Sequence, residues 1–169
     1  MTRPLLPCLA FIVFLCAGCA NYRLGQPAEL PFRTLYVAPV ANDSYAPQVQ
    51  VPLSNSIIDL FLNDGTVRIT QNQHTADAIL EVTVSEYERD VSTTDEDDTF
   101  LARSYNVTLR ADCTLKDQRT GTIYFENRSV SASNRVFFDS GFQPSEYENM
   151  PRLTRDLARE VRNLVLSTW

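Results

Sequence analysis

The chain has 169 residues, of which 44% are hydrophobic, and its formal net charge is −6. This length and composition suit one domain with its own core and exclude an intrinsically disordered chain. The acidic balance excludes a broad nucleic-acid-binding surface, which needs a basic footprint. A single histidine, His74, excludes zinc sites built from several histidines.

Residues 1–18 have the pattern of a bacterial lipoprotein signal peptide. The apolar run at residues 5–15 is too short to cross a bilayer, which takes about 20 apolar residues. The Cys-Ala-Gly-Cys motif at residues 16–19 resembles the lipobox that a lipoprotein signal peptidase recognises. We therefore predict cleavage between Gly18 and Cys19, and S-diacylglycerol and N-acyl groups on Cys19. An ordinary secretory peptide cut nearby is the alternative.

Residues 19–33 are irregular and contain prolines, which predicts a lipidated tether before a single domain at residues 34–169. Several acyl chains anchor a protein stably, at ~0.8 kcal/mol per buried methylene. Ala20 follows the cysteine, and the absence of Asp at this position resembles outer-membrane sorting. We predict a lipid-anchored protein on the periplasmic side of the outer membrane. The chain from Cys19 to Thr34 reaches at most about 50 Å, which keeps the domain near the membrane.

In the first half of the domain the sequence pattern predicts a strand, a helix and a second strand. Residues 34–40 read as a buried strand, and residues 78–91 begin with strict polar–apolar alternation. Between them Pro52 fits the first turn of a helix, and Gly65 fits its C-terminal stop. The apolar face of that helix consists of Leu53, Ile57, Leu60 and Phe61. A short extended piece follows, bracketed by Val67 and Ile69.

The second half predicts two more strands and a long helix. Residues 105–116 alternate most regularly, which predicts one buried and one polar face. A hairpin turn at 117–121 leads to a strand at 122–138, with a register change around Asn127. Tyr105, Val107, Leu109, Ala111, Cys113 and Leu115 share the apolar face of the first of these strands, whereas Asn106, Thr108, Arg110, Asp112, Thr114 and Lys116 share its polar face.

The last helix has two candidate starting points. Ser145 with Glu148 fits a capping box. Because proline interrupts helices, we expect the main helix to begin at Met150 or Pro151 instead. Its apolar stripe consists of Met150, Leu153, Leu157, Val161, Leu164 and Val165.

The predicted order is therefore β-α-β-β-β-α, an α/β chain of the α+β type. The β-α-β part implies one parallel strand pair joined by a right-handed crossover. Both helices have an apolar stripe to bury, most simply on one face of the sheet. We predict a two-layer sandwich with a four-stranded mixed sheet and two helices on one face.

Three features could carry chemistry, and each has a simpler interpretation. The acidic run at residues 95–98 lacks the glycine and distal glutamate of a calcium-binding loop, which favours a solvated hairpin tip. Cys113 lies on an apolar strand face, which favours a buried, unpaired core residue. His74 lies in a polar loop, with no Gly-x-Ser-x-Gly turn to use it as a base. We predict no metal, no cofactor beyond the covalent lipid, and no enzymatic activity.

The last helix also carries a basic stripe, spaced at steps of 3, 4 and 3. This stripe could face an acidic partner or phosphate groups. Asp156 and Glu160 interleave with it, so intrahelical ion pairs of ~0.2–0.5 kcal/mol each are an equal alternative. The stripe consists of Arg152, Arg155, Arg159 and Arg162.

Several short motifs together resemble one protein family. They are Asn21-Tyr22-Arg23-Leu24 after the lipobox, Ala76-Asp77-Ala78-Ile79-Leu80 at the second main strand, Arg103-Ser104-Tyr105 at the next strand, and Arg135-Val136-Phe137-Phe138-Asp139 before the last helix. With the order of elements, they are similar to LptE, the lipopolysaccharide-assembly lipoproteins of the outer membrane. The resemblance covers nearly the whole mature chain.

The resemblance implies a non-enzymatic protein that plugs an LptD-like β-barrel and helps to assemble it for lipopolysaccharide transport. It also implies a lipopolysaccharide contact through basic residues at sheet-end loops, and Arg103 matches one such place. A different envelope accessory, such as a peptidoglycan synthase activator or an export-system component, is the alternative. A periplasmic hydrolase would need a nucleophile–base pair, and the sequence offers none.

Overall fold

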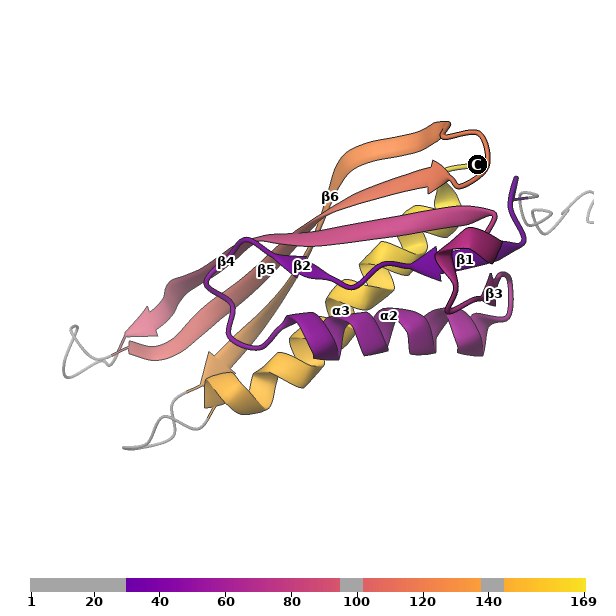
Figure 1. Ribbon diagram of the computed structural model, residues 1–169. Helices are drawn as coiled ribbons and strands as arrows, with labels where there is room; N and C mark the ends of the chain where they lie inside the picture. Colours follow the sequence, from indigo (N-terminus) through magenta and orange to yellow (C-terminus); the bar gives the residue numbers. More distant parts are fainter. Residues whose placement is uncertain (1–29, 95–101, 138–144) are drawn as a thin grey trace, which may run out of the picture.

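The computed structural model describes residues 30–94, 102–137 and 145–169 (Figure 1). Three long strands, three short strands, two α-helices and one 3-10 helix follow each other in these segments. They are β1 (Thr34–Val37), β2 (Ala41–Asn42), α2 (Gln50–Asp64), β3 (Arg68–Ile69), η2 (Gln73–Thr75), β4 (Ala78–Thr94), β5 (Ala102–Asp117), β6 (Ile123–Phe137) and α3 (Ser145–Ser167). The predicted order of main elements is confirmed.

The strands form one mixed sheet in the order β3-β1-β4-β5-β6, with β2 beside β4. The pair β1–β4 is parallel, with Tyr36 opposite Ile79, and α2 lies in the crossover between the two strands. Strands β4, β5 and β6 form an antiparallel meander. The sheet has six strands rather than four, because β2 and β3 add two residues each. Such short strands are too brief to show a period in the sequence.

Both helices lie on the same face of the sheet, as Figure 1 shows. From α2, the side chains of Leu53, Ile57 and Phe61 are fully buried, and Leu157 of α3 is as well. Shortening one of them to Ala would leave a cavity and cost about 2–5 kcal/mol. The sheet meets this layer with an apolar face that includes Leu80, Val82, Val84, Val107, Leu109, Ala111, Cys113 and Leu115.

The ends of α2 lie near the predicted positions. The helix starts at Gln50, so Pro52 still falls in the first turn, where its missing N–H costs no hydrogen bond. At the other end Gly65 adopts φ 70°, and its N–H donates to the Phe61 carbonyl at 3.1 Å. A left-handed residue after a helix is the common role of glycine, because it has no Cβ.

The pairing along the meander shifts register at several points, two of which bear on the polar and apolar faces. The β4–β5 register shifts between Val84 and Glu86, so Ser85 is an extra residue in β4. In β6 the shift predicted around Asn127 is confirmed: Asn127 has φ 48° and donates its N–H to Thr114 Oγ1 at 3.2 Å. Each bulge moves the following residues of its strand to the opposite face of the sheet.

The expectation that Pro151 would delay the last helix is wrong. Helix α3 begins at Ser145 and continues through Pro151. Pro151 has no N–H, so the helix lacks one of its backbone hydrogen bonds at this position. Met150, directly before the proline, is buried in the core. The Thr154 hydroxyl also donates to the Met150 carbonyl at 2.9 Å, across the proline.

Candidate functional site

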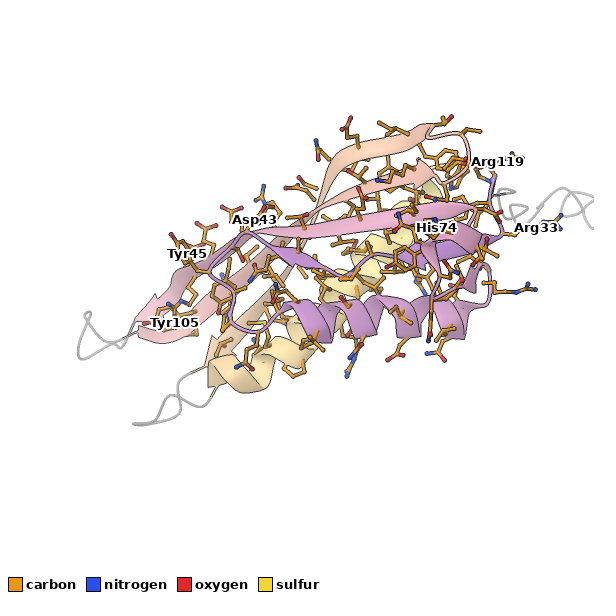
Figure 2. All side chains as sticks on the ribbon, in the orientation of Figure 1. Arg33, Asp43, Tyr45, His74, Tyr105 and Arg119 are labelled. Carbon is orange, nitrogen blue, oxygen red and sulfur yellow. The ribbon has the colours of Figure 1, made fainter. Side chains whose placement is uncertain are left out.

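The face of the sheet opposite the helices is a continuous polar surface on β4, β5 and β6, called here the polar face (Figure 2). Its members are partly or fully exposed. They are Glu81, Thr83, Glu86, Glu88, Asp90, Asn106, Thr108, Arg110, Asp112, Thr114, Lys116, Ser129, Ser131, Ser133 and Arg135. The predicted split of β5 into an apolar and a polar side is confirmed.

Neighbouring strands are joined across the polar face by side-chain pairs. Such exposed pairs contribute about 0.2–1 kcal/mol each, so they organise the surface more than they stabilise the fold. They are Arg110 Nε with Glu86 Oε2 at 2.9 Å, Lys116 Nζ with Glu81 Oε1 at 2.5 Å, Thr108 Oγ1 donating to Ser133 Oγ at 3.1 Å, Arg135 Nε donating to Asn106 Oδ1 at 3.5 Å, and Ser129 donating to Asp112.

Large exposed apolar side chains lie mostly elsewhere. Among the described residues, Ile123 stands at one end of the polar face, opposite Lys116. The others are Tyr45, Val51, Leu62 and Trp169. The polar face therefore offers hydrogen-bonding groups and charges of both signs rather than an exposed hydrophobic patch. Such a surface suits contact with water or polar groups.

Two arginines of the predicted basic stripe pair with carboxylates. Arg159 contacts Asp156 on the same helix at 3.0 Å. Arg162 reaches across to the end of α2 and contacts Asp64 at 3.3 Å, which links the two helices. Both side chains of the second pair are about three-quarters buried, so they serve the helical layer rather than an outer surface.

The other two arginines of the stripe, Arg152 and Arg155, are exposed on α3. Within the part of the chain that the structure describes, neither guanidinium makes an ion pair. The partner-facing role predicted for the stripe therefore depends on these two residues.

The hairpin of β4 and β5 extends beyond the helices, and Arg103 lies near its end. The strand begins at Ala102, because Ala102 pairs with Thr94 and Ser104 with Thr93. Arg103 is thus part of β5 rather than of the loop before it. The acidic run at 95–98 and the predicted lipidation site at Cys19 both lie outside the described residues.

Cys113 is a buried core residue and His74 an exposed residue of a polar segment, as the sequence predicted. The Cys113 side chain is fully buried and free, and burial together with nearby Asp112 raises the pKa of its thiol to about 12. A thiol of this kind is not a nucleophile at neutral pH. His74 is exposed in η2, where its backbone N–H donates to Asn72 Oδ1 at 3.0 Å.

A cavity of about 590 Å³ lies at the end of the sheet where the described chain begins. Three segments line it: residues 31–33 leading into β1, residues 74–77 leading into β4, and residues 117–119 in the β5–β6 turn. Asp77 joins the first two segments, because its Oδ2 accepts the N–H groups of Arg33 at 3.0 Å and Thr34 at 2.9 Å. The Asp77 carbonyl accepts the Gln118 N–H at 2.8 Å, which joins the third.

Asp117 organises the turn on the other side of this cavity. Its Oδ1 accepts the N–H groups of Arg119 at 2.9 Å and Thr120 at 2.6 Å, and its Oδ2 accepts the Tyr124 hydroxyl at 3.0 Å. The bonds from Thr120 lower the pKa of Asp117 to about 2. Bonds from Arg33 and Thr34 likewise lower the pKa of Asp77. Both carboxylates are therefore charged at neutral pH.

The sequence alone did not identify this cavity. Its three segments lie at least 40 positions apart in the chain, and each segment reads as an ordinary turn or strand end. The available signal was an aspartate at a strand end in two places: Asp77 directly precedes β4, and Asp117 is the last residue of β5. At such positions a carboxylate can accept backbone N–H groups.

Residues 32–165 match the model of the family described as LptE, lipopolysaccharide-assembly. The match spans nearly all of the folded domain. The chain belongs to this family. LptE membership gives the protein a role among the lipoproteins of lipopolysaccharide assembly and confirms the resemblance found in the sequence. No curated protein matches the sequence closely.

Solved structures share the LptE-like fold at low sequence identity. An uncharacterised lipoprotein B from Nitrosomonas europaea, solved by NMR, is 15% identical with a TM-score of 0.58, over 87% of this chain and 91% of that one. A crystal structure from Xanthomonas campestris is 13% identical with a TM-score of 0.59, over 85% and 90%. A hypothetical protein from Chlamydia trachomatis is 12% identical with a TM-score of 0.50, over 80% and 99%. These likenesses show the fold.

Residues 30–94, 102–137 and 145–169 hold no group of three or more His, Cys, Asp or Glu side chains placed to bind a metal ion. Nor does any helix in these segments have the length and apolar character needed to cross a bilayer.

Proposed function

We propose that the protein is a lipid-anchored plug of an LptD-like outer-membrane β-barrel, which it helps to assemble for lipopolysaccharide transport and insertion. The observation that carries this proposal is the polar face of the sheet in a chain of the LptE family. The lumen of such a barrel is polar and wet, so a plug needs a surface rich in hydrogen-bonding groups.

The cross-strand pairs of the polar face support this role. In the Arg110–Glu86 and Thr108–Ser133 pairs, both partners remain partly exposed and keep further hydrogen-bonding capacity. Many moderate polar contacts of this kind over a large area would give a stable complex without one dominant residue. The exposed guanidinium groups of Arg152 and Arg155 add a second polar contact area on α3.

Lipidation of Cys19 would hold the domain at the periplasmic side of the outer membrane. Intact-mass analysis of the membrane-extracted protein should find a diacylglycerol and an acyl chain on Cys19, with residues 1–18 removed. The Cys19→Ser variant should remain as precursor or become a soluble periplasmic protein. An unmodified Cys19 in the wild type would end this part of the proposal.

Arg103 is the residue proposed to meet lipopolysaccharide. It lies near the end of the β4–β5 hairpin, far from the sheet end at which the described chain begins. Arginine forms charge-assisted, bidentate bonds with phosphate, which is the chemistry such a contact needs. Arg103→Glu should weaken lipopolysaccharide binding and leave the melting temperature unchanged, whereas equal binding by both proteins would refute the contact.

The test of the whole proposal combines depletion with purification. Depletion of the protein should reduce assembled barrel and surface lipopolysaccharide. A C-terminal tag should then recover the barrel in detergent at a fixed ratio. If the tag recovers a peptidoglycan synthase or an export component while barrel levels stay normal, the accessory role in another envelope complex is correct instead.

A further inference from the structure

The cavity between residues 31–33, 74–77 and 117–119 holds fixed groups of both charge signs. Asp77 and Asp117 line it, and so do Arg33 and Arg119. Figure 2 shows Arg33, His74 and Arg119 at the same end of the molecule. A ligand complementary to this lining carries a negative and a positive group close together.

The two guanidinium groups are available to a ligand. Both arginines are exposed, and within the described residues their side chains form no ion pair or hydrogen bond. Their backbone N–H groups, by contrast, are fixed by the two aspartates: Arg33 by Asp77 and Arg119 by Asp117. The stems of both arginines therefore start from rigid positions, which lowers the entropy cost of binding.

The carboxylates keep unused acceptor capacity. Two backbone N–H groups donate to Asp77 Oδ2, and the two oxygens of a carboxylate offer about four acceptor positions, so the group can accept further hydrogen bonds. The backbone bonds that lower the pKa of Asp77 keep it ionised at neutral pH. It can therefore receive an ammonium group while the arginines hold an anion.

The surroundings of the cavity resemble the interface of a membrane. Phe32, Tyr124 and Trp169 form a cluster beside it, with ring centroids 5.1–6.0 Å apart. Trp169 is 38% exposed, and the Tyr124 hydroxyl donates to Asp117. Tyrosine and tryptophan favour the boundary where one side is apolar and the other wet.

The chain also leads from this end toward the proposed anchor. Leu30, the first described residue, precedes the cavity residues directly, and eleven peptide steps back to Cys19 span at most about 36 Å. If Cys19 is lipidated, as the proposed function requires, the cavity lies within reach of lipid headgroups.

We propose that this cavity binds the zwitterionic headgroup of a phosphatidylethanolamine-type lipid, with Arg33 and Arg119 on the phosphate and Asp77 on the ammonium. The ammonium group can donate hydrogen bonds to a carboxylate, which a choline group cannot. The site thereby fixes the orientation of the domain on the membrane surface. A free phosphate or soluble phosphoethanolamine shares part of this chemistry and is separated from the lipid by the experiment.

The test uses the full lipidated chain in detergent and three short-chain lipids below their micelle concentrations. Binding is followed by backbone amide chemical shifts of residues 33, 77 and 119. Phosphatidylethanolamine should shift these signals saturably, whereas phosphatidylcholine and phosphatidylglycerol should bind at least about tenfold more weakly. Equal shifts with all three lipids would refute headgroup recognition. Equal affinity for inorganic phosphate or free phosphoethanolamine would assign the cavity to a soluble ligand.

Matched charge variants complete the test. Arg33→Gln with Arg119→Gln should weaken phosphatidylethanolamine binding about tenfold or more. Arg152→Gln with Arg155→Gln removes the same charge from α3 and should leave the affinity unchanged. Equal losses in both pairs would mean that net charge, not the cavity, attracts the lipid. Barrel co-purification is a separate readout. Loss of lipid binding would therefore not refute the plug role, and loss of barrel co-purification would not refute lipid binding.

Discussion

Asp77 and Thr34 hold each other by two reciprocal hydrogen bonds across 43 positions of the chain. Asp77 Oδ2 accepts the Thr34 N–H at 2.9 Å, and the Asp77 N–H donates to Thr34 Oγ1 at 2.8 Å. The same carboxylate oxygen also accepts the Arg33 N–H. This lock fixes the start of β1 against the start of β4, the strand that pairs in parallel with β1 on one side and antiparallel with β5 on the other.

Loss of the Asp77 carboxylate should loosen that junction. Asp77→Ala leaves two backbone N–H groups without their acceptor, and we expect a loss of about 1 kcal/mol in the free energy of unfolding. Asp59→Ala, at an exposed position of α2, is the control and should change stability by less than about 0.5 kcal/mol. Urea unfolding of both variants measures the difference, and equal losses would contradict the role of the lock.

The two aspartates should also make stability depend on acid. Their folded-state pKa values are lowered, to about 2 for Asp117, so the folded protein binds fewer protons than the unfolded chain. The stabilisation is complete above the unfolded pKa of about 3.9 and is lost as pH falls toward 2. Urea unfolding across this range should show a steeper loss for the wild type than for Asp117→Asn. Identical slopes would count against the lowered pKa.

Cys113 should behave as a buried, unreactive thiol. Because its pKa is raised to about 12 and its side chain is fully buried, alkylation at neutral pH should proceed only through unfolding. Cys113→Ala should cost on the order of 1 kcal/mol and leave function intact. Peptide mass analysis after timed labelling measures the rate. Rapid modification of the peptide containing Cys113 in the folded protein would show that the strand face is accessible.

Pro151 offers a direct test of where α3 begins. Since the helix starts at Ser145, Pro151 is an interior residue that lacks one hydrogen bond of the ladder. Pro151→Ala restores the N–H and should raise the free energy of unfolding by about 1 kcal/mol or more. A helix that began at Met150 would place the proline in the first turn, and the same substitution would then bring no gain. Thermal or urea unfolding distinguishes the two.

Much of the fold could be predicted because its long elements carry clear periods. The alternation from Tyr105 to Lys116 predicted both faces of β5, and the helical spacing from Leu53 to Phe61 predicted α2. Helix α3 begins before its predicted start, because a proline inside a helix removes one hydrogen bond but need not end the helix. The bulge at Ser85 left no signal, since an extra residue in a strand is defined only by its partner.

The polar face, the basic stripe and the cavity could be predicted from the sequence less fully than the fold. The polar side of β5 followed from the sequence, but its Glu86–Arg110 and Thr108–Ser133 pairs depend on register. The basic stripe of α3 was visible as spacing, whereas the bond from Arg162 to Asp64 depends on how the helices pack. The mixed-charge cavity required three distant segments to meet, which no local pattern encodes.

In the proposed complex the polar face lies against the inner wall of the barrel. A photo-crosslinking residue at position 131 replaces Ser131, an exposed residue of β6 opposite Arg110, and one at position 59 samples the outer side of α2 for comparison. Irradiation of living cells, followed by tag purification and mass spectrometry, identifies the captured protein. We expect position 131 to capture the LptD-like barrel. Capture of a different envelope protein at position 131, with no crosslink to the barrel from either position, would contradict it.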